Sequence, residues 1–191
     1  MATNYVDKDS GNNGNSGNSA GAAYATLAYA LAALGAGDTL YIEASTTDYV
    51  WTAATLPDNV TLIGSVAPNP VTSEYVRVNA GGGNSVWQLS GSFTAHKIWF
   101  YNHPQTGSSQ FYPLRTFTGN RVLTFEDCII SDCGSMVSTA SRGGIIGGGS
   151  SVSADQAAST VVTLRRCAFW DLVSTINSGS LVRSVSVWTV L

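Results

Sequence analysis

Two pairs of charged residues have the types and spacing to do chemistry. Glu126 and Asp127 form an acidic pair, and Arg165 and Arg166 form a basic pair 39 positions further along the chain. Carboxylates and arginines grouped on one face can form a catalytic site, but opposite charges on neighbouring strands also neutralise each other in surface ion pairs. We expect the second role, a ladder of ion pairs, if the two segments stack on each other.

Two further carboxylates, those of Asp132 and Asp171, could also form a pair. Carboxyl groups about 5 Å apart are the arrangement of a retaining glycosidase. However, Asn102 fills the equivalent place in a third segment, and Asn and Asp both favour turns, where their side chains bind local backbone groups. We therefore expect turn capping, and we assign no catalytic residue.

The histidines and cysteines give no sign of a metal or cofactor site. Neither His96 nor His103 lies in a recognisable Ser/His/Asp setting. The three cysteines, Cys128, Cys133 and Cys167, have neither CxxC spacing nor the Cys/His pairing of a zinc site. We expect reduced core cysteines, no metal and no cofactor.

The charged pairs belong to a sequence repeat. Segments 122–133 and 161–172 read VLTFEDCIISDC and VVTLRRCAFWDL, and segment 93–102, FTAHKIWFYN, aligns with both without a gap. Four apolar columns result: Phe93, Leu123 and Val162; Ala95, Phe125 and Leu164; Ile98, Cys128 and Cys167; and Phe100, Ile130 and Phe169.

The spacing of the repeat predicts a solenoid of stacked coils. A two-residue step at 96–97, 126–127 and 165–166 reverses the alternation of apolar and polar residues, which indicates a corner between two strands. The repeats lie 30 and then 39 residues apart, with the extra length in Gly/Ser-rich segments, as in proteins built from stacked coils. The outward ladder of such a stack would contain three threonines, Thr94, Thr124 and Thr163.

The remaining chain predicts one short helix and more strands. Residues 10–21 are rich in Gly, Asn and Ser and predict a loop. Apolar residues at helical spacing follow, with Thr26 as the N-cap and Gly35 as a left-handed residue at the C-terminal end. These apolar residues are Leu27, Ala30, Leu31 and Leu34. Strands are predicted at 39–43, 60–65, 75–80, 85–90, 93–102, 122–131, 161–171 and 181–190.

Together these elements predict an all-β chain with a short N-terminal capping helix. We expect one domain over residues 1–191, with the first strand, the Asn/Gly loop and the helix in residues 1–37 and stacked coils in residues 38–191. The run YVDKDSGNNGNSGNSAGAAYATLAYALAALGAGDTLYI resembles the opening of right-handed parallel β-helix proteins of the pectin-lyase-like class. The resemblance implies that fold but no single function, because polysaccharide lyases and hydrolases, adhesins, and tailed-phage spikes and virion proteins share it.

The composition excludes two classes of partner. Only 11% of residues are charged, against about 25% in a typical soluble domain, and the net charge is -3 with no run of Lys or Arg. Binding to a phosphate backbone needs a basic surface, so we expect no nucleic acid partner. The apolar stretch 22–34 is shorter than the roughly 20 residues that span a bilayer, so we expect no membrane insertion.

One outward surface stands out as a candidate site. On the second strand of the repeat, Trp99, Ile129 and Ala168 share one column, and Tyr101, Ser131 and Trp170 share the next. An apolar, aromatic stripe where solvent is expected indicates an interface or a ligand surface. We take Trp99, Tyr101, Ile129 and Trp170 as a candidate interface or glycan surface. The alternative is that another segment of the chain covers it.

These observations favour a non-enzymatic structural protein of a bacteriophage virion, such as a capsid decoration or accessory head protein. The expected partners are other virion proteins and further copies of this chain. The N-terminus lacks the pattern of a secretory signal, so we expect synthesis in the host cytoplasm and final location in the virion. One alternative is a tailspike or fibre that binds a host surface glycan, and a second is a polysaccharide lyase or glycoside hydrolase.

Overall fold

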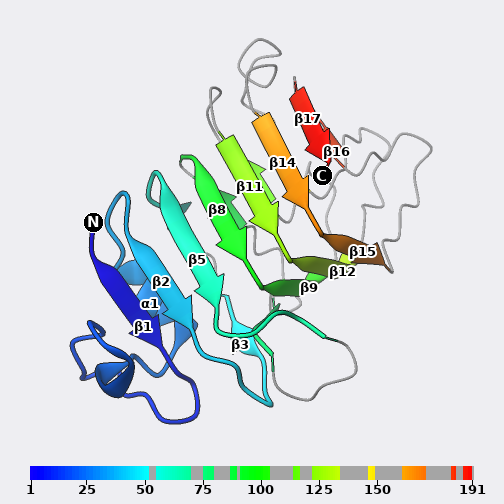
Figure 1. Cartoon of the computed structure of the whole chain (residues 1–191). Coiled ribbons are helices and arrows are strands. Elements are labelled where there is room, and N and C mark those ends of the chain that lie inside the picture. The colour runs from blue at the N-terminus through cyan, green and yellow to red at the C-terminus, as the bar shows by residue number, and fades with distance from the viewer. Residues whose placement is uncertain are drawn as a thin grey trace.

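The fold was analysed in a computed structural model of the chain (Figure 1). The structure describes residues 1–51, 55–69, 75–79, 87–89, 91–103, 114–116, 122–133, 146–148, 161–170, 182–183 and 187–190. Within these ranges the chain consists mainly of short strands, and the α-helix α1 and the 3-10 helix η1 are the helical elements. The predicted all-β class is therefore confirmed.

The largest sheet has seven parallel strands, and its order along the sheet follows the order of the chain. Its members are β1 (Thr3–Val6), β2 (Thr39–Ile42), β5 (Val60–Gly64), β8 (Phe93–His96), β11 (Val122–Glu126), β14 (Val161–Arg165) and β17 (Val187–Val190). Figure 1 shows these strands side by side, from blue at β1 to red at β17.

Two further sheets have five parallel strands each. The β3 sheet contains β3 (Tyr49–Val50), β6 (Arg77–Asn79), β9 (Trp99–His103), β12 (Ile129–Cys133) and β15 (Ala168–Trp170). The β4 sheet contains β4 (Thr55–Leu56), β7 (Trp87–Leu89), β10 (Leu114–Thr116), β13 (Ile146–Gly148) and β16 (Val182–Arg183). From β2 onward the chain visits the three sheets in a fixed rotation, so each strand pairs with strands of the preceding and following rounds.

The register confirms the columns predicted for the strands. Leu123 pairs with Phe93 on one side and with Val162 on the other, and Ile130 pairs with both Phe100 and Phe169. The threonine ladder is longer than the repeat predicted, because every strand of the large sheet contributes one residue. Its members are Thr3, Thr39, Thr61, Thr94, Thr124, Thr163 and Thr189.

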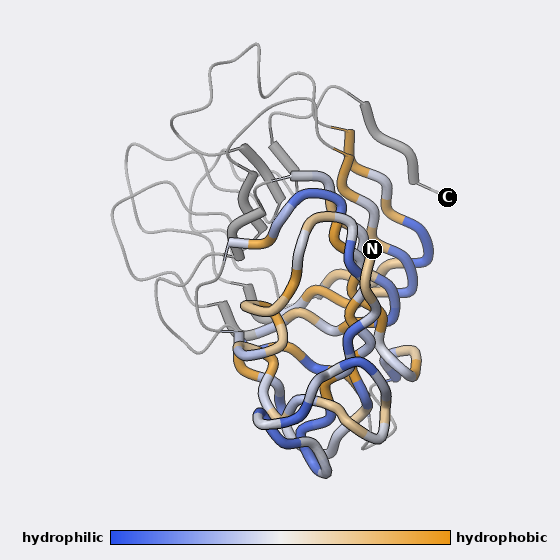
Figure 2. Tube along the Cα trace, turned by 90° about the vertical axis from the view of Figure 1, so that its left-hand side faces the viewer, coloured by the Kyte–Doolittle hydropathy of each residue, from blue (hydrophilic) through white to orange (hydrophobic). Residues whose placement is uncertain are grey.

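The hydrophobic core receives side chains from all three sheets. Leu62 and Phe125 from the large sheet, Val78 and Phe100 from the β3 sheet and Leu56 from the β4 sheet are fully buried in one cluster. Aromatic rings of successive coils meet inside, with the Phe93 and Phe125 ring centroids 5.8 Å apart. Figure 2 shows the underlying alternation as orange and pale segments along the described strands. Each buried large aliphatic or aromatic side chain contributes about 1.5–3 kcal/mol.

The N-terminal helix has the predicted start but not the predicted end. Helix α1 (Leu27–Ala32) begins after Thr26, whose side chain accepts a hydrogen bond from the Tyr29 amide. The prediction that Gly35 ends the helix in a left-handed conformation is wrong. The helix ends at Ala32, and its C-cap residue Ala33 has right-handed dihedral angles. The glycine with positive φ (80°) is Gly37, in the turn that leads into β2.

The loop before this helix covers the outer edge of β1. The Tyr5 amide donates to the Gly17 carbonyl (2.7 Å), the Tyr24 amide donates to the Tyr5 carbonyl (2.9 Å), and the Asp7 amide donates to the Tyr24 carbonyl (2.9 Å). These bonds satisfy backbone groups that an open edge strand would present to other chains. Within the described part of the chain, no helix is long and apolar enough to cross a membrane.

The predicted corners lie between the large sheet and the β3 sheet. Lys97, Asp127 and Arg166, which follow β8, β11 and β14 directly, all have positive φ, from 49° to 57°. A single left-handed residue turns the chain, so that the next residue, Ile98 or Cys128, points into the core. This explains why the alternation changes phase at each two-residue step.

Candidate docking face and charged corner

An aromatic and cationic cluster lies on the outer face of β6 and β9. Arg77 pairs in register with Trp99, and both point outward because their neighbours Val78 and Phe100 are buried in the core. The Trp99 ring lies 5.1 Å from the Tyr75 ring and 6.3 Å from the Tyr101 ring. We call the set Tyr75, Arg77, Trp99 and Tyr101 the docking face.

Arg77 contacts all three aromatic rings of this face. Its guanidinium carbon lies 4.9 Å from the ring centroid of Tyr101, 5.4 Å from that of Tyr75 and 5.9 Å from that of Trp99. Cation–π contacts of this kind stabilise by about 0.5–2 kcal/mol, depending on their exposure. The Arg77 Nε also forms an ion pair with Asp48, and both side chains are less than a third exposed.

Asp48 joins the ion pair to the tyrosine and asparagine side chains. The Tyr101 hydroxyl donates to Asp48, and the Asn79 amide donates to Asp48 Oδ2 (3.3 Å) and to the Tyr101 hydroxyl (3.0 Å). This network restricts the rotamers of the cluster. The repeat could not reveal Asp48, which lies in a loop, but the alternation in the segment YVRVN already places Tyr75 and Arg77 on the outer face.

The four residues predicted for this surface, Trp99, Tyr101, Ile129 and Trp170, differ in their exposure to solvent. Trp99 and Tyr101 are half-buried on the docking face. The expectation that Ile129 faces solvent is wrong, because it is only 6% exposed, and Ser131 in the next column is fully buried. Trp99 Nε1 donates to the Ser131 hydroxyl (2.8 Å). Trp170 pairs with Ser131 in register, but its side chain lies outside the described part.

A shallow pocket lies beside Ile129. Ala67 and Pro68, which follow β5, line this pocket together with Ile129 and Ala168. The alternative that another segment covers the stripe stays a prediction. Within the described residues, the accessible part of the predicted stripe comprises Trp99 and Tyr101, which are half-buried, and Ala168, which is exposed.

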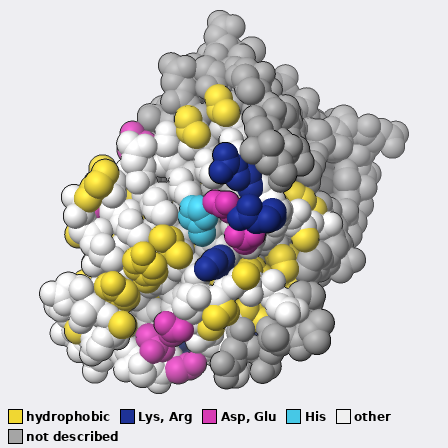
Figure 3. Space-filling model, viewed as in Figure 1, with side chains coloured by type: hydrophobic (Ala, Val, Ile, Leu, Met, Phe, Trp, Pro, Cys, Tyr) yellow, Lys and Arg dark blue, Asp and Glu magenta, His cyan; other side chains and the backbone are white. Residues whose placement is uncertain are grey.

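Three of the four charged residues, Glu126, Asp127 and Arg166, form the ion pairs predicted at the corner. Arg166 Nε lies 2.6 Å from Asp127 Oδ1, and Arg166 Nη2 lies 2.9 Å from Asp127 Oδ2 and 2.7 Å from Glu126 Oε1. On the other side, His96 Nδ1 lies 3.1 Å from Glu126 Oε2. Figure 3 shows histidine, acidic and basic side chains gathered in one group on this face. Because Arg166 donates to Asp127, the pKa of Asp127 lies below its ordinary value of 3.8.

The other predicted sites are only partly described. The side chains of Asp132, His103 and Cys133 lie outside the description, although their backbones belong to β12 and β9. Asp171 lies outside the described residues altogether. Cys128 is buried, as predicted, and Cys167 packs against the core. Among the described residues, no group of three or more His, Cys, Asp or Glu side chains could hold a metal ion.

The two described cysteines interact across neighbouring coils. Both side chains lie in the same inward column, and each thiol also approaches backbone carbonyls, Cys128 that of Ala95 (3.5 Å) and Cys167 that of Phe125 (3.4 Å). Burial raises the pKa of Cys128. A hydrogen bond from the Cys128 thiol lowers the pKa of Cys167.

Comparisons with known proteins add a distant structural likeness. No protein-family model matches the chain, and no curated protein matches it. Among solved structures the chain is similar to a rhamnogalacturonan lyase, with 12% sequence identity and a TM-score of 0.43 over 94% of this chain. The chain spans 60% of the length of that protein. Likeness at this level assigns no activity.

Proposed function

We propose that the three sheets close into a right-handed parallel β-helix and that the protein is a non-enzymatic component that docks on a partner protein through the docking face. The fixed rotation of the chain through three parallel sheets supports the solenoid. Crossover connections between parallel strands are almost always right-handed, which supports the hand.

The composition of the docking face carries the docking proposal. Trp, Tyr and Arg are the residue types in which the binding energy of protein interfaces concentrates, and Tyr75, Arg77, Trp99 and Tyr101 bring these types together on one outer surface. Because the Asp48 network already orders these side chains, the docking face would lose little rotamer entropy when a partner binds.

The charged corner favours a structural role over catalysis. Asp127 and Glu126 both accept hydrogen bonds from Arg166, so the Asp127 carboxyl is held ionised rather than poised to exchange a proton near neutral pH. A general acid needs its pKa raised toward the working pH. Arg166, in turn, is occupied by two carboxylates.

The narrower form of the proposal places the protein in a bacteriophage virion, as a capsid decoration or accessory head protein. This setting rests on the resemblance of the N-terminal run to β-helix proteins, a class that includes virion proteins. The partner would be another virion protein, and the same face could join copies of this chain.

A reconstitution experiment tests both parts. Particles that lack the protein are mixed with wild type, Trp99→Ser or Tyr29→Ser, and bound protein is measured by co-sedimentation. Tyr29 is a matched control, since it is an exposed aromatic residue on α1 that is not a member of the docking face. Loss of an interface hot spot of about 2 kcal/mol weakens binding about 30-fold.

We expect wild type and Tyr29→Ser to co-sediment equally with the particles, and Trp99→Ser to stay in the supernatant. Thermal unfolding of all three proteins checks that each is folded. If wild type does not bind particles, the virion setting is wrong. If Trp99→Ser binds as well as wild type, the docking face is wrong. Binding to whole host cells rather than to particles would favour the alternative of a spike that recognises a host glycan.

A further inference from the structure

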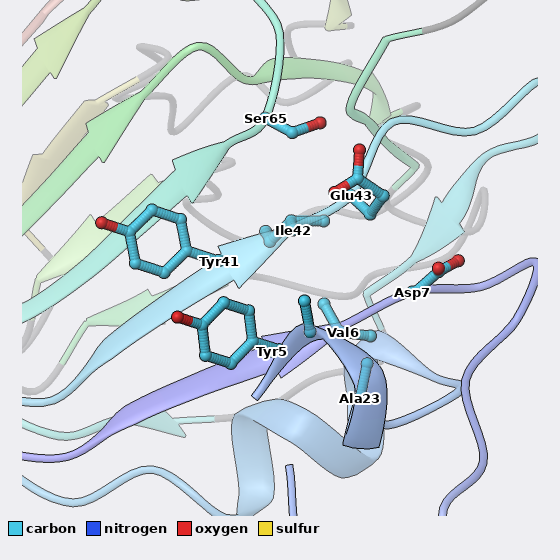
Figure 4. Close-up of a pocket in the computed structure, with 9 residues that line it drawn as sticks. Tyr5, Val6, Asp7, Ala23, Tyr41, Ile42, Glu43 and Ser65 are labelled. Atoms are coloured by element: carbon cyan, nitrogen blue, oxygen red, sulfur yellow. The ribbon is translucent and has the colours of Figure 1, made fainter. Parts of the chain in front are cut away.

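A pocket lies beside the first strands of the large sheet, at their C-terminal ends, and shares no residue with the docking face. Tyr5 and Tyr41 form one side, and Asp7, Glu43 and Ser65 lie where β1, β2 and β5 end. Figure 4 shows the two rings one above the other and the two carboxylates with the Ser65 hydroxyl beyond the strand ends. The buried strand residues between them make the floor mainly apolar. An apolar floor with a few polar groups at the rim is the usual form of a small-ligand site.

The two tyrosines form a rigid aromatic wall. They pair in register on neighbouring strands, with ring centroids 5.4 Å apart and planes 15° apart. Tyr41 is 40% exposed although its ring is fixed by stacking. An exposed, immobilised aromatic side chain offers apolar contact at low entropic cost, and the C–H groups of a pyranose ring match such a surface.

The rim offers both kinds of hydrogen-bonding group. Ser65 Oγ accepts a hydrogen bond from the Ala44 amide (2.9 Å), which leaves its hydroxyl hydrogen to donate to a ligand. Glu43 is exposed and presents a carboxylate acceptor. A sugar hydroxyl can both donate and accept, so it satisfies Glu43 and Ser65 together. An ammonium group can only donate, so it cannot accept the hydrogen bond that the Ser65 hydroxyl offers.

The local charge selects against acidic ligands. Asp7 and Glu43 are negative, and the residues that line the pocket in the described part of the chain include no Lys or Arg. The ammonium group of the neighbouring Lys8 donates a hydrogen bond to the backbone carbonyl of Asp48. A uronate, sulfate or phosphate in the pocket would therefore be repelled by the two carboxylates of the lining.

We propose that this pocket binds one neutral sugar residue, which packs against Tyr41 and hydrogen-bonds to Glu43 and Ser65. The site is independent of the docking face, so the two proposals stand or fall separately. A second function follows for the protein, recognition of neutral glycans at its N-terminal end.

Saturation-transfer NMR and calorimetry on the full chain test this site. The probes are lactose, cellobiose and maltose as neutral sugars, digalacturonate as an acidic sugar and choline as an ammonium ligand. The variants are Tyr41→Ala, Glu43→Gln and the control Tyr29→Ala, which removes an exposed tyrosine outside the pocket. Because Tyr41→Ala could disturb stacking with Tyr5, Glu43→Gln tests the rim in a nearly isosteric form.

We expect at least one neutral disaccharide to bind, with no binding of digalacturonate or choline. Tyr41→Ala should weaken this binding tenfold or more, Glu43→Gln should weaken it several-fold, and Tyr29→Ala should leave it unchanged. The proposal is overturned if none of the neutral sugars binds at millimolar concentration, if digalacturonate or choline binds more tightly, or if both pocket variants bind like wild type.

Discussion

Arg166 forms a bidentate ion pair with Asp127, although 39 residues separate them in the chain. Each residue follows its strand in the same left-handed conformation, with φ of 49° and 53°. The contact therefore joins the residues that follow β11 and β14, two strands that pair in register, and it makes that pairing measurable.

The coupling between these two residues should depend on salt. A double-mutant cycle with Asp127→Asn and Arg166→Gln should show favourable coupling in low salt, measured from urea unfolding midpoints. Because Arg166 is 61% exposed, 1 M NaCl should remove most of the coupling. Coupling that does not change with salt would mean that the pair is not a solvent-exposed ion pair.

The same pair predicts a pH dependence. The pKa of Asp127 is lower in the folded protein than its ordinary value of 3.8, so the unfolded chain binds the proton more readily. The stability that the Asp127 carboxylate adds is thus complete above pH 3.8 and is lost as pH falls through the lower folded pKa. Unfolding midpoints of wild type and Asp127→Asn should converge below that pH. In an Arg166→Gln background the two should show no such convergence.

The corner conformation restricts which residues fit at Lys97. Its φ of 57° is unfavourable for ordinary L-residues and worst for β-branched ones, whereas Asn tolerates it. Lys97→Val should lower the free energy of unfolding by about 1–2 kcal/mol, and Lys97→Asn should be nearly neutral. Chemical denaturation of the three proteins provides the measurement. Equal stability of the Val and Asn variants would contradict a left-handed corner.

The core predicts a sharp contrast within one strand. Phe125 is fully buried and its ring meets those of Phe93 and Phe100, so Phe125→Ala should cost about 3–5 kcal/mol. Val122, three residues earlier in the same strand, is 49% exposed, and Val122→Ala should change stability by less than about 0.5 kcal/mol. Comparable losses at both positions would show that β11 does not present alternating faces.

The cysteine pair predicts selective alkylation. Because the Cys128 thiol donates to Cys167, the pKa of Cys167 is lowered, and Cys167 should react with iodoacetamide at neutral pH while buried Cys128 should not. Peptide mass spectrometry after timed labelling locates the modified residue. In Cys128→Ala the pH midpoint for labelling Cys167 should rise. An unchanged midpoint would mean that the two thiols do not interact.

The parts of the fold that repeat could be predicted from the sequence. Columns such as Phe93, Leu123 and Val162 follow from alternation alone, and the charged steps marked the corners because a left-handed residue shifts the phase. Gly35 misled because glycine permits a left-handed conformation without requiring it, and the turn placed that conformation at Gly37.

The candidate site was harder to predict because it depends on contacts outside the repeat. Asp48 reaches Arg77 and Tyr101 from a loop, and no periodicity marks a loop residue as a neighbour of a strand. Likewise, the alternation placed Ile129 on the outward side of its strand, but it contains no information about the segment with Ala67 and Pro68 that lies against the same pocket.

The charges at the corner also affect which strands of the large sheet can pair during folding. A chain that skipped one round during folding would place the coil of Thr163 directly on the coil of Thr94, and the threonine ladder would not detect the error, since it offers the same side chain in every round. The apolar columns would disfavour this wrong pairing only slightly, because each round offers apolar side chains at the same places. At the corner, however, Arg166 would then lie beside Lys97 instead of Asp127, and like charges would repel. The alternating charges of Lys97, Asp127 and Arg166 thus favour the correct order of the rounds over a pairing that skips one.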